Sequence, residues 1–329
     1  MDFNKPRVAI YYDVLPQTGM RNDGAPLFMH GNFRKLINGD DLIGNNRLMN
    51  DDSKNVVHLS PITPTAQHGS FDLNVLVDYG EDTLGIPLDW EIPHPNVYWA
   101  FDTHIDEKGY QYRLNRAKQF DQVYLCHDFK IADFIRDGID PKKIAYMPCA
   151  AEHTCYRPFP IMEKWDWCFI GFLHNEFRVD LIDRFIREFG LGDKGYMGWR
   201  IPEFKGHCVL EDTAKKFSQS RILLNESVGQ DMNMRTFETM ACRQMLLTED
   251  VPPLHSLFQD GKHLVTFKTI DEAVEKARYY LAHSEERKAI AEAGYQEILA
   301  KHTYNHRARE ILKTCIGWEP EVALEGALR

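Results

Sequence analysis

Short apolar runs alternate with amphipathic stretches along most of the chain. The apolar runs have the length of strands buried on both faces, and they lie at 7–13, 56–59, 73–77, 97–102, 122–126, 144–147, 167–172, 222–224, 245–247 and 264–267. Between them, helices are expected at 27–37, 177–189, 232–242, 270–282, 285–302 and 304–315, where apolar residues recurring every three or four positions would form one buried face, and a basic, polar helix is expected at 109–120. This alternation predicts an α/β protein with doubly wound parallel sheets.

The pattern is interrupted at residues 151–164, which contain Pro158 and Pro160 and show little periodicity. We expect a Rossmann-like N-terminal domain at 1–160 and a second Rossmann-like domain at 161–329. The last helix either stays with the second domain or returns to the first. Residues 14–25 have no apolar period and predict a loop, which either covers a ligand or is an ordinary surface loop.

Composition narrows the functional classes. The 329 residues are 43% hydrophobic and 27% charged, as in ordinary globular proteins, and no apolar run is long enough for a membrane span. A net charge of −10 disfavours general nucleic-acid binding. The N-terminus shows no secretory signal. Seven scattered cysteines without a Cys-x-x-Cys pair indicate reduced thiols in a cytoplasmic protein.

The stretch 221–250 reads as a strand, a loop, a helix and a second strand. Gly229 gives the loop backbone freedom, and Asp231 is expected to be the N-cap of the helix. Asp231, Arg235 and Glu238 recur at helical spacing along one stripe. The stripe is either a solvated row of ion pairs or part of a ligand site. The position of the stripe favours the ligand site, because α/β sheets bind ligands where a strand passes into a helix. The start of a helix, together with the charge of Arg235, favours a phosphate group as the ligand.

Polar residues also follow other predicted strands. Asp102 and His104 end the run at 97–102, and His127 follows the next strand and ranks below His104. Each is either a functional residue or a polar cap of a turn. His302 and His306 lie one helical turn apart and could hold a metal, but helix packing is the better interpretation because no third ligand is apparent. We therefore predict no metal site.

Several motifs together resemble the donor-binding half of GT-B glycosyltransferases, most closely the spore-maturation CgeB-like branch. The matching stretches cover roughly residues 95–312 and include Val97-Tyr-Trp-Ala-Phe-Asp-Thr-His104, Tyr146-Met-Pro-Cys-Ala-Ala151, Trp167-Cys-Phe-Ile-Gly171 with Arg178, Asn225-Glu-Ser227, and Gly229-Gln-Asp-Met-Asn-Met-Arg-Thr-Phe-Glu-Thr-Met-Ala-Cys242. The resemblance implies two Rossmann-like domains that face a cleft, with helices at the C-terminus.

The resemblance also implies transfer of a hexose-type sugar from a nucleotide-diphosphate donor, with UDP as the default, by a retaining reaction that needs neither a metal nor a cofactor. Glu238 matches a glutamate that binds the donor ribose, and Arg178 matches a basic residue that contacts the diphosphate. The remaining donor-binding candidates are Asn225, Gly229, Asp231, Asn233 and Arg235. The catalytic candidates are Asp102, His104 and Arg235.

Two positions depart from the family pattern. Gln230 stands where the family has a glutamate, and Asp183 stands where a lysine often follows the phosphate arginine, so Arg235 is our candidate substitute. Two alternatives remain, a nucleotide-sugar-binding protein without turnover and a sugar-nucleotide epimerase. The acceptor stays open.

Overall fold

The computed structural model describes residues 5–11, 25–38, 56–59, 70–78, 91–171, 173, 175–198 and 209–319. The chain divides into two compact units, which are described separately. The first unit comprises Met1–Leu15, Gly24–Pro148 and Tyr304–Arg329, and the second comprises Pro16–Asp23 and Cys149–Thr303. The predicted loop at 14–25 lies outside the described residues, except for Ala25.

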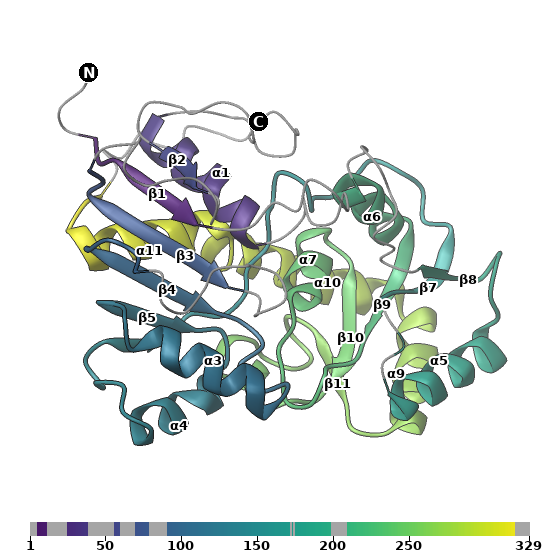
Figure 1. The fold of residues 1–329 in the computed structure, drawn as a ribbon. Helices are drawn as coiled ribbons and strands as arrows, with labels where there is room; N and C mark the ends of the chain where they lie inside the picture. The colour runs from purple at the N-terminus through teal and green to yellow at the C-terminus, as the bar shows by residue number, and fades with distance from the viewer. Residues whose placement is uncertain are drawn as a thin grey trace. The chain divides into compact units, whose positions relative to one another are not determined.

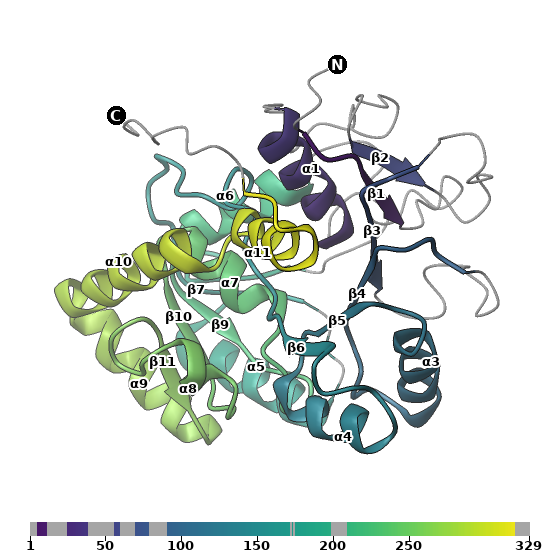
Figure 2. The same ribbon diagram turned by 90° about the vertical axis from the view of Figure 1, so that its left-hand side faces the viewer.

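The first unit is built on a six-stranded parallel sheet with the order β2-β1-β3-β4-β5-β6 (Figures 1 and 2). Its strands are β1 (Val8–Tyr11), β2 (Val56–Leu59), β3 (Leu73–Asp78), β4 (Asn96–Ala100), β5 (Gln122–Leu125) and β6 (Ile144–Tyr146). Its helices are α1 (Ala25–Asn38), α3 (Glu107–Ala117), the 3-10 helix η3 (Asp128–Lys130), α4 (Ile131–Arg136) and α11 (Tyr304–Ile316).

Helices cover both faces of this sheet (Figure 2). On one face, Tyr304 of α11 packs against Phe28 of α1 and Trp99 of β4, with ring centroids 5.1 and 6.1 Å apart. On the other face, Leu114 of α3 and Phe134 of α4 join the core formed by alternate strand residues. Successive strand side chains point to opposite faces, so strands buried on both sides are apolar throughout, as the sequence predicts.

The second unit has a five-stranded parallel sheet with the order β11-β10-β9-β7-β8. Its strands are β7 (Trp165–Ile170), β8 (Gly195–Gly198), β9 (Ser220–Asn225), β10 (Met245–Glu249) and β11 (Val265–Phe267). Its helices are α5 (Glu176–Phe189), α6 (Val209–Ser218), α7 (Met234–Ala241), α8 (Leu254–Leu257), α9 (Ile270–Ala282) and α10 (Ser284–Lys301). The predicted class, two doubly wound α/β units, is confirmed.

The units change at Pro148, before the predicted division of 1–160 and 161–329. Ala151 donates its amide to the carbonyl of His302 and pairs with Thr303, and the amide of Phe159 bonds Ser218 Oγ. These hydrogen bonds tie residues 149–160 to the second unit. At the other end, α11 belongs to the first unit because it packs on α1 and β4. None of the helices in the described ranges is long and apolar enough to cross a bilayer.

Candidate functional site

The carboxyl end of β9 in the second unit leads through a turn into α7. Gly229 has a φ of 69°, the left-handed conformation that glycine adopts most readily. The turn delays the helix, so Asn233 is the N-cap and α7 begins at Met234. The prediction that Asp231 caps this helix is therefore wrong. Asp231 lies two residues before the cap, in the segment that follows the Gly229 turn.

Arg235, in the first turn of α7, lies against the carboxyl ends of two strands. Its Nη1 donates to Asn225 Oδ1 at 3.2 Å, and its guanidinium lies 5.5 Å from the centre of the Phe169 ring. A Cβ at Gly171 would come within 2.7 Å of Arg235 Nη2. The glycine after β7 therefore makes room for this guanidinium, which contacts the side-chain amide of Asn225 and the face of the Phe169 ring.

Arg178, in the first turn of α5, is almost fully buried, with 2% of its surface exposed. Its Nε donates to Glu226 Oε2 at 2.5 Å, and its Nη2 donates to the main-chain oxygen of Glu226 at 2.8 Å. Its guanidinium also lies 5.8 Å from the centre of the Phe169 ring. Two arginines thus share one aromatic ring, but the charge of Arg178 is directed toward Glu226.

Glu226 and Glu249 bring two carboxylates to this edge. Glu226 accepts from Asn175 Nδ2 at 3.0 Å in addition to its bond with Arg178. Glu249, at the end of β10, accepts the amide of Ser227 at 3.3 Å. Burial, followed by the negative charge of Glu226, raises the pKa of Glu249. The edge therefore contains both signs of charge in close contact.

Asn233 links α7 to the end of β9. Its Nδ2 lies 3.3 Å from Asn225 Oδ1 and 3.4 Å from the main-chain oxygen of Glu226. Its side chain makes no capping hydrogen bond with α7. The side-chain Nδ2 of Asn225 in turn donates to Thr248 Oγ1 on β10 at 3.1 Å. These contacts fix the approach of α7 to the sheet.

Glu238 lies one turn further along α7, and only 3% of its surface is exposed. Its charge acts on Cys242, where burial and then Glu238 raise the pKa of the thiol. The predicted alternative of a solvated ion-pair row therefore does not fit Glu238. Its role in ribose binding stays a prediction, as do the roles of Gly229 and Asp231.

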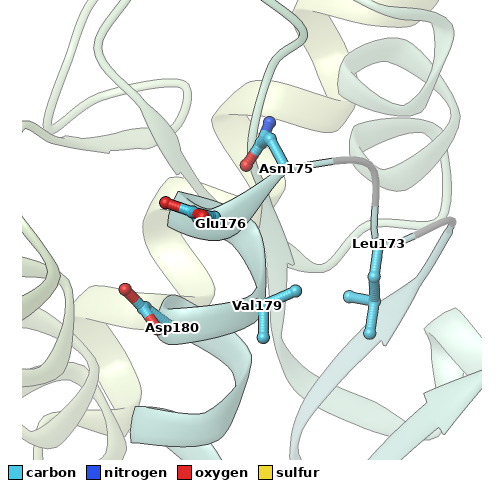
Figure 3. Close-up of a pocket in the computed structure, with 5 residues that line it drawn as sticks. All are labelled: Leu173, Asn175, Glu176, Val179 and Asp180. Atoms are coloured by element: carbon cyan, nitrogen blue, oxygen red, sulfur yellow. The ribbon is translucent and has the colours of Figure 1, made fainter.

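A hollow of about 550 Å³ lies beside the start of α5 (Figure 3). It is lined by Leu173, Asn175, Glu176, Val179 and Asp180. The side chains of Glu176 and Asp180 extend from the same face of the helix. Two carboxylates in its wall make this hollow a poor site for a diphosphate, because like charges repel.

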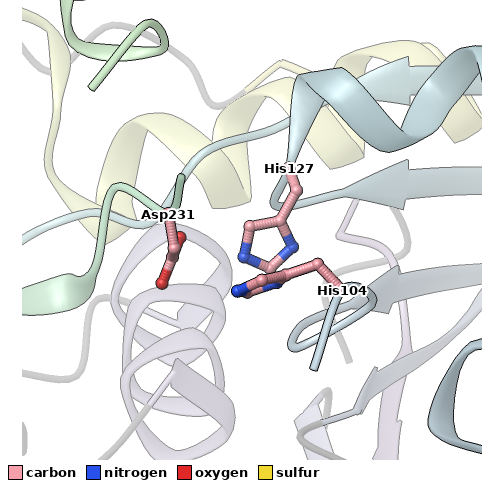
Figure 4. A group of neighbouring side chains, drawn as sticks. All are labelled: His104, His127 and Asp231. Carbon is pink, nitrogen blue, oxygen red and sulfur yellow. The ribbon is translucent and has the colours of Figure 1, made fainter. Parts of the chain in front are cut away.

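The first unit presents another polar edge after β4 and β5. Asp102 has a φ of 51°, a conformation that costs energy for a residue with a Cβ. Thr103 Oγ1 lies 3.1 Å from His127 Nδ1. The rings of His104 and His127 meet at 4.3 Å with an angle of 60° (Figure 4), and both lie 5.7 Å from the Phe129 ring. The structure thus brings His127 together with His104. Asp231, also drawn in Figure 4, belongs to the second unit.

His302 follows α10 and packs against aromatic rings within the second unit. Its ring lies 5.8 Å from that of Phe237 and 5.1 Å from that of Phe258. The helix-packing interpretation therefore fits His302. His306 belongs to the first unit.

From the sequence, Trp167–Gly171 is recognised only as a family motif, and Phe169, Gly171 and Glu249 are given no place at this edge. Phe169 and Gly171 lie more than sixty positions before Arg235, and no periodicity within one element indicates such a contact. Glu249 ends a predicted strand beside the one that ends at Asn225. Strand ends meet at one edge of a parallel sheet, and that rule could have identified it.

Comparison with known proteins gives one family match over part of the chain and several similar solved structures. Residues 182–313 match a protein family described as Glycosyl transferase-like. HepE from Anabaena, solved with UDP and glucose, is 11% identical with a TM-score of 0.63, over 94% of this chain and 99% of HepE. A variant of TarM from S. aureus, solved with UDP and other ligands, is 10% identical with a TM-score of 0.55, over 74% of this chain and 55% of TarM.

Pneumococcal O-GlcNAc transferase GtfA, solved with UDP and GlcNAc, is 14% identical with a TM-score of 0.51, over 74% of this chain and 56% of GtfA. The chain thus spans little more than half of TarM and GtfA. A comparison with curated proteins found no match. The fold is that of GT-B glycosyltransferases, as expected. The CgeB-like branch stays a prediction.

Proposed function

We propose that the protein transfers a hexose-type sugar from a nucleotide-diphosphate donor to an acceptor that is still to be identified. The observation that carries this proposal is the match of residues 182–313 to a glycosyltransferase-like family. That range contains the turn and helix at which Arg235 and Asn225 are in contact. UDP-sugars are the first donors to test, because HepE, TarM and GtfA were all solved with UDP.

In this proposal, Arg235 and the start of α7 meet the diphosphate. Sugar transfer requires the leaving diphosphate to be stabilised as its charge grows, and a fixed guanidinium beside a helix N-terminus supplies that stabilisation. Asn225 and Asn233 hold Arg235 and the helix start in place. Glu238 binds the ribose hydroxyls, and Gly229 and Asp231 shape the loop before the helix.

Asp102 and His104 are the proposed contacts to the transferred sugar or the acceptor. A carboxylate or imidazole can orient the acceptor hydroxyl or take its proton. The left-handed backbone at Asp102 supports a functional role, since strained residues cluster at active sites. A retaining reaction without a metal or other cofactor is part of the proposal and rests on the family resemblance.

The cytoplasmic location also remains a proposal. Six cysteines in the described part of the chain are free thiols, which is consistent with a reducing compartment. The negative net charge disfavours nucleic acid as the acceptor.

Incubation of the full chain with UDP- and GDP-sugars tests the activity. Cleaved donor or a glycosylated acceptor supports the transferase. Saturable binding without turnover would support a binding protein, an alternative motivated by Gln230 at a position where the family has glutamate. An isomerised nucleotide sugar, detected by chromatography and mass spectrometry, would indicate an epimerase instead.

A further inference from the structure

Arg178 and Arg235 flank the same ring but face different partners. Two nitrogens of Arg178 donate hydrogen bonds to Glu226, one to its carboxylate and one to its main-chain oxygen. Arg235 donates to the side-chain oxygen of Asn225. Because Arg178 and Glu226 are 2% and 3% exposed, this ion pair lies inside the unit.

The buried pair is connected to Arg235 by a continuous set of contacts. The main-chain oxygen of Glu226 accepts from Arg178 and lies 3.4 Å from Asn233 Nδ2. Asn233 Nδ2 also approaches Asn225 Oδ1, the atom that accepts from Arg235. A change in the Arg178–Glu226 pair would therefore move the end of β9. The side-chain oxygen of Asn225, which accepts the hydrogen bond that orients Arg235, would move with it.

We infer that Arg178 is a positioning residue: through Glu226 it fixes the end of β9, and thereby sets the place of Arg235, which meets the donor diphosphate. This inference rests on the proposed function. It assigns Arg178 a role different from the direct phosphate contact that the family resemblance implies.

Charge and burial support this role. Removing one partner of a buried ion pair leaves an uncompensated charge, whereas replacing both with apolar residues of similar volume is often tolerated. A positioning role consequently predicts that Glu226, which repels phosphate, is as important for diphosphate binding as Arg178. A direct phosphate contact predicts the opposite, because a glutamate beside the phosphate would weaken binding.

The test compares UDP with uridine on the full chain by titration calorimetry. The variants are Glu226→Gln, Arg178→Met and the double variant Arg178→Met with Glu226→Met. Arg184→Met is the matched control, since Arg184 lies on the same helix and pairs with Glu188 and Asp271 at the surface. Circular dichroism and thermal unfolding check that each variant is folded.

We expect Glu226→Gln and Arg178→Met each to weaken UDP binding about 10- to 100-fold, by analogy with the loss seen when the partners that orient metal ligands are removed. Uridine affinity should stay within about twofold, because the lost interaction is with phosphate. The double variant should recover most of the UDP affinity, and Arg184→Met should match the wild type. Loss of stability alone would leave the UDP-to-uridine ratio unchanged and would contradict the inference.

Two other results would overturn it. One is a Glu226→Gln variant that binds UDP as well as or better than the wild type. The other is a double variant that binds UDP as weakly as Arg178→Met, since this would show that the guanidinium itself is needed. If the wild type binds no nucleotide at all, the proposed function fails and the role of the pair fails with it. The wild-type titration therefore separates the two failures.

Discussion

The two units have the same kind of sheet but present different chemistry where their strands end. In the first unit, the ends of β4 and β5 carry Asp102, His104 and His127, groups that accept or exchange protons. In the second unit, two arginines gather around Phe169. The first set is suited to orienting or deprotonating a hydroxyl. In the second, Arg178 is already paired with Glu226, so Arg235 is the group suited to an anion.

The family match falls mainly on the second unit. Residues 182–313 include the helix with Arg235 and Glu238, whereas the edge with Asp102 and His104 lies outside that range. Nucleotide-sugar donors share a diphosphate and a ribose, but acceptors differ widely in structure. In the proposed function, the second unit therefore binds the donor, and the first unit is the proposed place of the acceptor chemistry.

Arg235→Ala should have the largest effect. We expect turnover to fall about ten- to a thousandfold, because the variant lacks the cation that meets the developing phosphate charge. Steady-state kinetics with the preferred nucleotide sugar measure this change, and Arg235→Lys tests whether charge without the guanidinium fork suffices. Turnover within twofold of the wild type would mean that Arg235 and the start of α7, at the sheet edge of the second unit, do not stabilise the leaving group.

Glu238→Ala should weaken donor binding while the protein stays folded. Glu238→Gln is the matched variant, because it keeps the side-chain volume at a position only 3% exposed. Loss of hydrogen bonds to a carboxylate corresponds to a decrease in affinity of about 10- to 100-fold. The wild type should prefer UDP over its 2′,3′-dideoxy analogue, and Glu238→Gln should lose this preference. Unchanged nucleotide affinity in both variants would remove the ribose assignment.

Asp102→Gly tests whether the strand ends of the first unit, after β4 and β5, take part in the reaction with the acceptor. Glycine accepts the φ of 51°, so the free energy of unfolding should stay within about 1 kcal/mol of the wild type. Acceptor-dependent turnover should fall at least about tenfold, with donor affinity unchanged. Chemical denaturation and kinetics give the two values. Full activity in Asp102→Gly would show that the aspartate serves the turn alone.

Glu249→Gln should produce the smallest effect, visible as a change in the pH dependence of stability. Burial and Glu226 raise the pKa of Glu249, so folding favours its protonated form. Protonated Glu249 therefore contributes to the free energy of unfolding below the ordinary pKa of a glutamate. This contribution is lost as the pH rises through the raised pKa of Glu249 in the folded protein. The glutamine variant should therefore melt at a higher temperature than the wild type at pH 8, and the difference should disappear near pH 4.

Glu292→Gln provides a control of opposite sign for this pH effect. A hydrogen bond from Gln296, together with Arg243, lowers the pKa of Glu292. Its replacement should therefore lower the melting temperature at pH 8. Equal shifts in both variants across this pH range would contradict the electrostatic account of Glu249.

Much of the fold follows from the sequence because buried parallel strands are short apolar runs and their helices have one apolar face. The predicted helix at 177–189, for example, corresponds to α5 at Glu176–Phe189. The start of α7 was missed because the turn at Gly229 extends to Asn233, which local propensity does not determine.

The candidate site was less predictable because its contacts join distant parts of the chain. Arg178 and Glu226 are 48 residues apart. The family resemblance singles out Arg178 as a phosphate contact, but nothing in the sequence pairs it with Glu226. The space that Gly171 leaves for Arg235 likewise depends on the neighbouring positions of β7 and β9 in the sheet. Strand order has to be known before such contacts can be inferred.

The most direct measurement of the central claim is a calorimetric titration of UDP and uridine into the wild-type chain and into Arg235→Ala. If the edge at β9 and α7 recognises the donor diphosphate, the wild type should bind UDP at least about tenfold more tightly than uridine. Arg235→Ala should bind both with similar affinity. Equal binding of UDP and uridine by the wild type, or an undiminished preference for UDP in the variant, would contradict the account.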